Sequence, residues 1–147
     1  MEHVIQPIDR KLIIDELTTD KFIRNTRKGD NKIYEITYED SPHTMREIGR
    51  LREISFRLAG GGTGKPIDID EFDTDSKNPY KQLIVWDPKD QEVIGGYRYI
   101  QCSGLKTEQL ATSELFNFSE TFVKDYMPFT IELGRSFIQP NYQSTNI

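Results

Sequence analysis

The stretch from Phe129 to Pro140 alternates apolar and polar residues with a period of two, the repeat of a β-strand. The pattern sets Phe129, Ile131, Leu133 and Phe137 on one face, opposite Thr130, Glu132, Gly134 and Ser136. Glu132 and Arg135 lie inside this strand, where charges are costly to bury unless they are paired or used. Two interpretations stay open here: an ordinary ion pair at a sheet rim, and a site of chemistry.

Residues three apart in a regular strand point to opposite faces. Glu132 and Arg135 therefore share a face only if the strand is bulged between them. We predict the bulge at Gly134, because a glycine within a strand often marks a bulge or a close approach to a ligand.

Other apolar runs predict the rest of the sheet. Ile33 to Tyr38 alternates like a strand. Lys81 to Trp86 is nearly all apolar at its centre, which favours a strand covered on both faces. Asp87 to Asp90 is a tight turn that leads into a partner strand from Glu92 to Gln101, so the two strands form an antiparallel hairpin.

Near-helical spacing predicts a helix from residue 8 to about residue 25, with Asp9 as its cap. Phe22 and Ile23 either continue this helix or start a short second turn. A longer helix opens at Ser41 and Pro42, or at a capping box of Thr44 and Glu47.

The longer helix has one apolar side, made of Met45, Ile48, Leu51, Ile54 and Leu58. The opposite side is polar, with Arg46, Arg50, Glu53 and Arg57. Arg52 and Phe56 are four residues apart and lie at the edge of the apolar side. We therefore expect Arg52 to lie closer to the core than the other basic residues.

Two loops follow the helix. Gly60 to Lys65 resembles a phosphate-binding loop, but Ala59 and Pro66 stand where that motif needs a glycine and a Ser or Thr. We expect these glycines to end the helix and leave a mobile loop.

The second loop, residues 68 to 73, contains four carboxylates. Three interpretations are open: a calcium loop that lacks its required glycine and terminal glutamate, a solvated acidic loop, and carboxylates that pair with arginines or receive a cationic substrate.

Residues 104 to 127 are predicted to be irregular, with short helical turns near 107 to 110 and 118 to 124. Their expected core anchors are Leu115, Phe116, Phe118 and Phe122.

Composition narrows the functional classes. The 147 residues have a net charge of −5, a pI near 5.1 and a mean hydropathy of −0.64, which argue against nucleic acid as the main partner. Cys102 is the single cysteine, so the chain cannot form an internal disulfide or a thiolate metal cluster. With only two histidines, His3 and His43, we expect neither a zinc site nor a Ser-His-Asp triad, and no metal. With no apolar run typical of a signal peptide or membrane span, we expect a cytoplasmic protein.

Several phrases resemble those of acyl-homoserine-lactone (autoinducer) synthases. They are more similar to the amino-acid N-acyltransferases that make lyso precursors of ornithine and glycine lipids, often named hemolysins. The matching phrases are Arg50 to Glu53 with Phe56-Arg57, Asp70 to Asp73, Val93 to Arg98, and Glu132 to Arg135 continuing to Pro140 and Tyr142. The resemblance covers about residues 45 to 142.

The resemblance implies a GNAT-like α/β fold, with a largely antiparallel central sheet flanked by helices. We expect one domain over residues 1 to 147, with 1 to 40 as a helical and strand lead-in and 41 to 142 as the family-like core. In that superfamily a glycine-containing phosphate loop follows the glutamate strand, whereas Ser144-Thr145-Asn146 has no glycine. We therefore expect the C-terminal part of the fold to be missing.

The resemblance also implies a reaction, in which an amino group attacks the thioester of an acyl carrier protein or of acyl-CoA. The thioester is then a substrate, and no bound cofactor is expected. Glu132 is the expected base and Arg135 a second catalytic residue, while the backbone of Leu133 and Gly134 contacts the thioester. The implied substrate-binding residues are Arg52, Phe56, Asp70, Asp73, Arg98 and Phe116.

The arginines have two open tasks: a buried cluster with the aspartates, or binding of the amino acid's carboxylate while an aspartate takes its cationic group. The implied partners are acyl carrier protein, an amino acid, the inner-membrane surface and a second copy that pairs along the 129 to 140 edge. Two alternatives are an autoinducer synthase, whose S-adenosylmethionine pocket the sequence does not identify, and a non-catalytic domain that binds lipid or protein.

Overall fold

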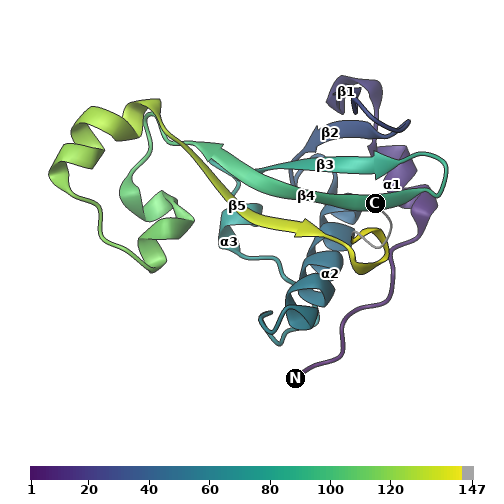
Figure 1. Cartoon of the computed structure of the whole chain (residues 1–147). Helices are drawn as coiled ribbons and strands as arrows, with labels where there is room; N and C mark the ends of the chain where they lie inside the picture. Colours follow the sequence, from purple (N-terminus) through teal and green to yellow (C-terminus); the bar gives the residue numbers. More distant parts are fainter. Residues whose placement is uncertain (144–147) are drawn as a thin grey trace.

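Five antiparallel strands form one sheet in the order β1-β2-β3-β4-β5. This computed structural model describes residues 1–143, and Figure 1 shows the long helix α2 crossing one face of the sheet. The strands are β1 (Phe22–Asn25), β2 (Lys32–Ile36), β3 (Lys81–Asp87), β4 (Glu92–Gln101) and β5 (Ile131–Ile138). The predicted antiparallel sheet flanked by helices is confirmed, as is the β3–β4 hairpin.

The α-helices are α1 (Arg10–Glu16), α2 (Pro42–Leu58) and α3 (Glu71–Thr74). Short helical turns join the remaining elements, at Thr19–Lys21, Thr107–Gln109, Ala111–Glu114, Phe122–Tyr126, Met127–Phe129 and Pro140–Tyr142. No helix within the described residues is long and apolar enough to span a bilayer.

Two apolar clusters hold the fold together. The larger one lies between α2 and the sheet, where Met45, Ile48, Ile84 and Val93 are each at most 1% exposed. The smaller one surrounds Tyr80, 0% exposed, and includes the buried thiol of Cys102. Burial of this kind is worth about 1.5–3 kcal/mol for each large apolar side chain, so these clusters supply most of the driving force.

The first predicted helix is shorter than its apolar spacing indicates. Asp9 is its cap, as expected, and accepts a hydrogen bond from Lys11 N at 2.9 Å. However, α1 ends at Glu16, and Phe22 and Ile23 begin β1 instead of continuing the helix. The ring of Phe22 packs edge-on against Tyr34 of β2, so pairing with β2 outweighs the weak helical pattern.

The N-terminus of α2 is capped from a distance. Ser41 is the N-cap and Pro42 lies in the first turn, as expected, but the Ser41 side chain makes no capping hydrogen bond. Instead the carboxylate of Glu16 accepts from His43 N at 3.0 Å and Thr44 N at 2.6 Å. Partial burial opposes ionisation, but these hydrogen bonds hold the pKa of Glu16 below its usual value.

Two further contacts fasten the N-terminal segment along α2. Ile8 N donates to Glu47 Oε2 at 3.0 Å, and Arg57 Nη1 donates to the carbonyl of Glu2 at 2.7 Å. In Figure 1 this segment runs beside α2 in the direction opposite to the helix. It is therefore held near both ends of α2 and at its middle.

The predicted faces of α2 are correct near its start and wrong at its end. Leu58, expected on the apolar side, is 70% exposed, whereas Glu53, expected on the polar side, is 0% exposed. Arg52 is also 0% exposed, as its place at the edge of the apolar side indicated. The sheet does not reach the last turn of α2, and the next loop covers Glu53 instead.

The glycine-rich loop, Gly60 to Lys65, folds around the carboxylate of Glu53. Glu53 accepts from Thr63 N at 3.0 Å, Thr63 Oγ1 at 2.7 Å and Gly64 N at 2.8 Å, and it pairs with Arg57 at 2.7 Å. Gly62 and Gly64 adopt φ of +92° and +77°, which a glycine accommodates without strain. The loop thus binds an anion, but that anion is a side chain of the same protein.

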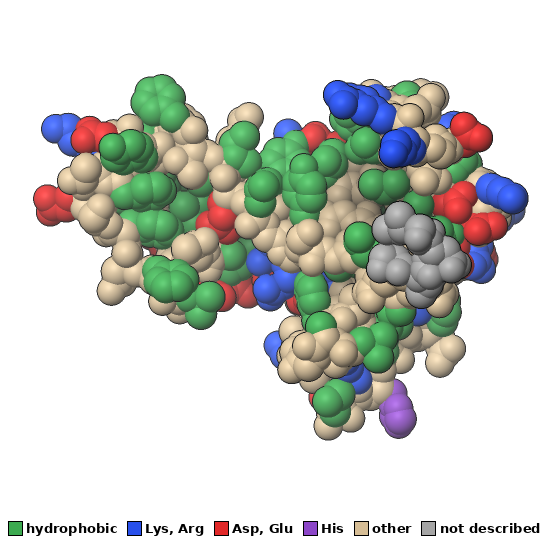
Figure 2. Space-filling model, in the orientation of Figure 1, with side chains coloured by type: hydrophobic (Ala, Val, Ile, Leu, Met, Phe, Trp, Pro, Cys, Tyr) green, Lys and Arg blue, Asp and Glu red, His purple; other side chains and the backbone are tan. Residues whose placement is uncertain are grey.

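Residues 102 to 130, here called the lobe, project beyond the end of the sheet between β4 and β5 (Figure 1). Its predicted core anchors are only half correct. Phe118 and Phe122 stack at 5.1 Å and pack on the smaller cluster, whereas Leu115 and Phe116 are 79% and 66% exposed. Figure 2 shows hydrophobic side chains on the outside of this lobe. Leu115 and Phe116 lie outside the smaller cluster.

The Glu53 carboxylate gives a first testable prediction. Burial opposes ionisation, but the hydrogen bonds from Arg57 and the loop lower the pKa of Glu53 from 4.5 to about 2. A carboxyl whose pKa falls on folding contributes stability above its unfolded pKa and loses it as the pH falls towards the folded value. We expect Glu53→Gln to lower the free energy of unfolding by about 3 kcal/mol at neutral pH.

Urea denaturation of this chain and its Glu53→Gln variant measures this difference. The difference in the free energy of unfolding should narrow by about 2 kcal/mol between about pH 7 and about pH 3, because Glu53 takes up a proton in the unfolded state but stays largely ionised in the folded state. A difference that stays constant over this range would show that the charge of Glu53 does not hold the loop.

Candidate functional site

A bulge in β5 determines where its side chains point. Arg98 of β4 pairs with Gly134 and Gly96 pairs with Phe137, so Tyr97 alone faces the two residues Arg135 and Ser136. Arg135 adopts a φ of +52°, a left-handed conformation that costs a residue with a side chain about 1–3 kcal/mol. The predicted bulge is thus confirmed, one residue after Gly134.

The bulge reverses the alternation of β5. Phe137 is buried at 6% exposure, whereas Ile131 and Leu133 are 54% and 62% exposed. The prediction that these residues share one face with Phe129, itself 89% exposed, is wrong, because the extra residue moves Phe137 to the core side.

Arginines and aspartates meet beside this bulge. The set comprises Arg52 of α2, Arg98 of β4, Arg135 of β5, and Asp68, Asp70 and Asp73 around the start of α3, and is called the arginine–aspartate cluster. Its three positive and three negative charges balance. Among the open interpretations of the acidic loop, pairing with arginines is the one the structure shows.

The inner part of the cluster is fully buried. Asp73 pairs with Arg52 at 3.1 Å and with Arg98 at 3.2 Å, and both Arg52 and Asp73 have side chains that are 0% exposed. Gln82 of β3 completes it, since it accepts from Arg52 at 2.6 Å and donates to Asp73 at 2.8 Å. Such a buried charge network depends on every member being matched.

Asp70 and Asp73 also begin α3. Asp70 accepts from the backbone N–H of Phe72 and of Asp73, while Asp73 accepts from Asp70 N at 3.2 Å, a reciprocal capping box. Asp70 pairs with Arg98 at 2.7 Å. Burial opposes ionisation, but the hydrogen bond and charge of Arg98 hold the pKa of Asp70 below its usual value.

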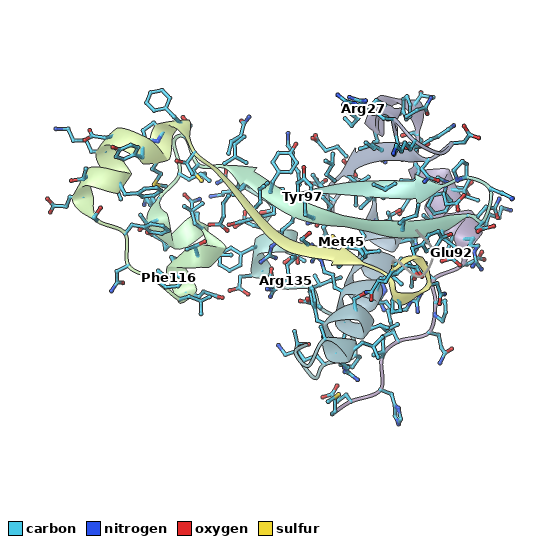
Figure 3. The ribbon with its side chains drawn as sticks, in the orientation of Figure 1. Arg27, Met45, Glu92, Tyr97, Phe116 and Arg135 are labelled. Carbon is cyan, nitrogen blue, oxygen red and sulfur yellow. The ribbon has the colours of Figure 1, made fainter. Side chains whose placement is uncertain are left out.

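The outer part of the cluster is looser. Arg135 has a side chain 37% exposed, and its contacts are 3.2 Å to Asp68 Oδ2 and 3.6 Å to Asp70 Oδ2. In Figure 3 Arg135 lies beneath β5, beside α3. Figure 2 shows basic and acidic side chains together at this junction of the lobe and the sheet. Arg135 is therefore the most exposed member of the cluster.

Glu132 faces a different partner. Its Oε1 accepts from the Tyr80 hydroxyl at 2.6 Å and its Oε2 from Thr112 N at 3.4 Å. Burial and the neighbouring Glu132 raise the pKa of Tyr80, whose ring also stacks 4.9 Å from the Arg98 guanidinium. Among the residues that the structure describes, Glu132 forms no ion pair with Arg135, whose salt bridges go to Asp68 and Asp70 instead.

Of the remaining predicted site residues, Phe56 and Gly134 lie near the arginine–aspartate cluster. Phe56 is half-buried and lines a pocket of about 480 Å³ together with Asp68, Arg135 and Ser136. Gly134 lies opposite Arg98, and a Cβ there would be 3.9 Å from Arg98 Nε.

Phe116 is not brought to the cluster, because it lies on the lobe, well apart from Arg135 in Figure 3. Sequence reasoning also missed three residues: Asp68 as a separate member of the acidic run, Tyr80, and Gln82. Asp68 belongs to the acidic run in the sequence, whereas no local pattern marks Tyr80 or Gln82.

Comparison with known proteins identifies the family. The model of the acetyltransferase (GNAT) domain matches residues 51–147. A glycine N(alpha)-acyltransferase of Phocaeicola vulgatus is 55% identical over 150 residues, and one of Bacteroides thetaiotaomicron is 53% identical over 150 residues. Each match covers 99% of this chain, but only 46% and 44% of the two relatives.

The chain thus spans less than half the length of the curated relatives it matches. No solved structure matches it significantly. The expectation about Ser144 to Asn146 lies outside the described residues. The antiparallel sheet, the bulged strand with its charged neighbours, and the match over residues 51–147 agree, and the chain belongs to the GNAT family of acyltransferases.

Proposed function

We propose that this chain forms part of an N-acyltransferase that moves a fatty acyl group from a thioester to the amino group of glycine. The observation that supports it best is the identity of 55% and 53% to two proteins named glycine N(alpha)-acyltransferase, over 99% of the chain. We further propose acyl carrier protein as the donor, with acyl-CoA as the alternative, and an N-acylglycine that enters lipid synthesis.

The proposed reaction forms one bond and breaks one. The glycine nitrogen attacks the thioester carbonyl carbon, the new C–N bond forms, the C–S bond breaks, and the thiol leaves with a proton. Before the attack, Glu132 takes one proton from the glycine ammonium through water, which frees the nitrogen lone pair, and the second proton lost by the nitrogen goes to the leaving thiolate. Since Tyr80 and Thr112 N both donate to Glu132, its carboxylate is held in one place on β5.

The bulge supplies the second element of the proposed mechanism. A bulge leaves one residue without its ladder partners, here at Arg135 and Ser136 directly after Gly134, and β5 is the edge strand of the described sheet, so part of its backbone is not used by the ladder. We propose that N–H groups near Leu133 and Gly134 hold the thioester oxygen as negative charge develops on it. Gly134 has no side chain to block this approach.

The cluster has two tasks in this proposal. Arg52, Asp73, Asp70 and Arg98 hold β4, α2 and α3 together, because their charges are matched within the protein, and Gln82 joins β3 to them. Arg135 is partly exposed and binds the carboxylate of the amino acid. Contacts of Phe116 with substrate, association with the inner membrane and self-association along β5 stay predictions.

The glycine named in the relatives favours this proposal over the two alternatives from the sequence. An autoinducer synthase would take a different amino donor, and a non-catalytic domain would need no base beside the bulge. Mass spectrometry after incubation of the full-length protein with each acyl donor and a panel of amino acids distinguishes all three.

Glu132 gives a second testable prediction. If Glu132 is the base, Glu132→Gln lowers the rate of N-acylglycine formation at least about 100-fold, because proton removal by a positioned group contributes this much. Glu120→Gln is the matched control, since Glu120 is exposed on the lobe. Product is quantified by mass spectrometry, and urea denaturation checks that both variants are folded. Equal rates for the two variants would contradict the assignment.

Asp73 gives a third prediction, which distinguishes a structural role of this residue from a role in glycine binding. Asp73→Asn leaves two buried arginines without their shared anion, so the free energy of unfolding should fall by about 3–5 kcal/mol. Asp75→Asn, just beyond α3 and exposed, should have a much smaller effect. Urea denaturation measures both. A stable Asp73→Asn variant with impaired glycine binding would instead place Asp73 among the binding residues.

A further inference from the structure

A pocket of about 480 Å³ opens between the end of α2, the glycine-rich loop and the bulge of β5. Its lining includes Phe56, Gly62, Thr63, Asp68, Arg135 and Ser136. The pocket therefore borders the strand segment to which the proposed function assigns the thioester. Its volume lies within the range of pockets that hold small ligands.

Asp68 places a buried carboxylate in the wall of this pocket. Its side chain is 3% exposed, and within residues 1–143 its Oδ2 accepts no hydrogen bond. Arg135 Nε lies 3.2 Å from this oxygen, close enough for an ion pair but without hydrogen-bond geometry. A buried carboxylate oxygen without a donor is costly, and burial raises the pKa of Asp68 although Arg135 and Arg52 oppose the shift.

Packing against α2 holds Asp68 in place. Asp68 N donates to the carbonyl of Gly49 at 3.1 Å, and Arg52 Nη1 donates to the carbonyl of Asp68 at 3.5 Å. A Cβ on Gly49 would lie 2.7 Å from the side chains of both Ile67 and Ile69. Only a glycine lets this segment lie so close to the helix, so the free oxygen has a defined position before any ligand arrives.

The carboxylates of the other two aspartates of the cluster already have partners within the protein. Asp70 and Asp73 cap α3 and pair with the buried arginines. Arg135 resembles Asp68 in having unused capacity: in the part of the chain that the structure describes, none of its N–H groups makes a hydrogen bond. One pocket thus presents a carboxylate and a guanidinium that are close together but weakly engaged.

We propose that this pocket binds the acceptor amino acid as its zwitterion, with Asp68 accepting from the ammonium group and Arg135 binding the carboxylate. The inference rests on the proposed N-acyltransferase function and adds Asp68 as the residue that recognises the acceptor nitrogen. An ammonium offers three donors and a carboxylate accepts a guanidinium in a bidentate manner, so the ligand replaces one long contact by two charge-assisted pairs. It also brings the nitrogen beside the bulge.

The test uses the full-length protein and its Asp68→Asn variant, with Asp75→Asn as the matched control. Calorimetry measures glycine binding without donor, and kinetics measure KM for glycine and for the acyl donor separately. We expect Asp68→Asn to weaken glycine binding about 30-fold and to leave the KM of the donor unchanged. Asp75→Asn should change neither quantity.

Ligand analogues distinguish recognition of the nitrogen from a general loss of structure. Glycolate keeps the carboxylate and has a hydroxyl in place of the ammonium. Wild-type protein should bind glycine more tightly than glycolate, and Asp68→Asn should lose most of this preference. If Asp68→Asn weakens both ligands equally, or neither, the inference is overturned.

Arg135→Gln provides a second variant that changes an exposed residue, should Asp68→Asn not fold. It should weaken glycine and glycolate alike and leave methylamine, which lacks the carboxylate, unaffected. Unchanged binding of all three ligands would overturn the inference. Asp68-dependent glycine binding without N-acylglycine formation would refute the proposed function alone, whereas N-acylglycine formation with unchanged glycine affinity in Asp68→Asn would refute the site alone.

Discussion

The buried pair of Arg52 and Asp73 is the interaction on which the rest of this structure depends. It joins the middle of the long helix α2 to the start of α3 and, through Arg98 and Gln82, to the two central strands. Neither charge reaches solvent, so each is stable only while the other is present. The positions of the acidic loop and of β4 beside the bulge follow from this mutual requirement.

The outer edge of the cluster differs from its centre in a way that suits binding. At the centre, each carboxylate oxygen of Asp73 has a partner within the protein, although Arg52 Nε and Arg98 Nε make no hydrogen bond within residues 1–143. At the edge, Asp68 and Arg135 are held by the backbone and by a bulge with a left-handed residue, and their side chains keep hydrogen-bonding capacity. The buried centre of the cluster thus positions the charges of Asp68 and Arg135, and a ligand that binds between them can pair with both.

Much of the fold was predictable from the sequence, and the failures have physical causes. The β3–β4 hairpin, the start of α2 and the bulge in β5 follow from local patterns, namely alternation, a helix-start proline and a strand glycine. The pattern could not show at which residue the alternation reverses, because the position of the bulge depends on the pairing of Gly96 with Phe137 and of Arg98 with Gly134 across the sheet.

Long-range partners explain the other differences. The resemblance implies every cluster residue except Asp68, but it leaves their pairing open, because the partners come from separate elements, α2, α3, β4 and β5. Tyr80 and Gln82 went unnoticed because their partners lie 52 and 9 residues away. Phe116 is expected in the core, yet it is 66% exposed, and Phe118 and Phe122 pack on the smaller cluster instead.

The N-terminal segment has a role beyond that of a lead-in. Glu2, Ile8 and Glu16 contact the end, the middle and the start of α2, and Glu16 supplies the capping acceptor that Ser41 does not. The helix therefore cannot unwind at either end without releasing this segment. Opening of the ends of α2 should therefore be coupled to release of this segment, so the hydrogen-bonded amide protons of Ile8, His43 and Thr44 should be protected from exchange to a similar degree.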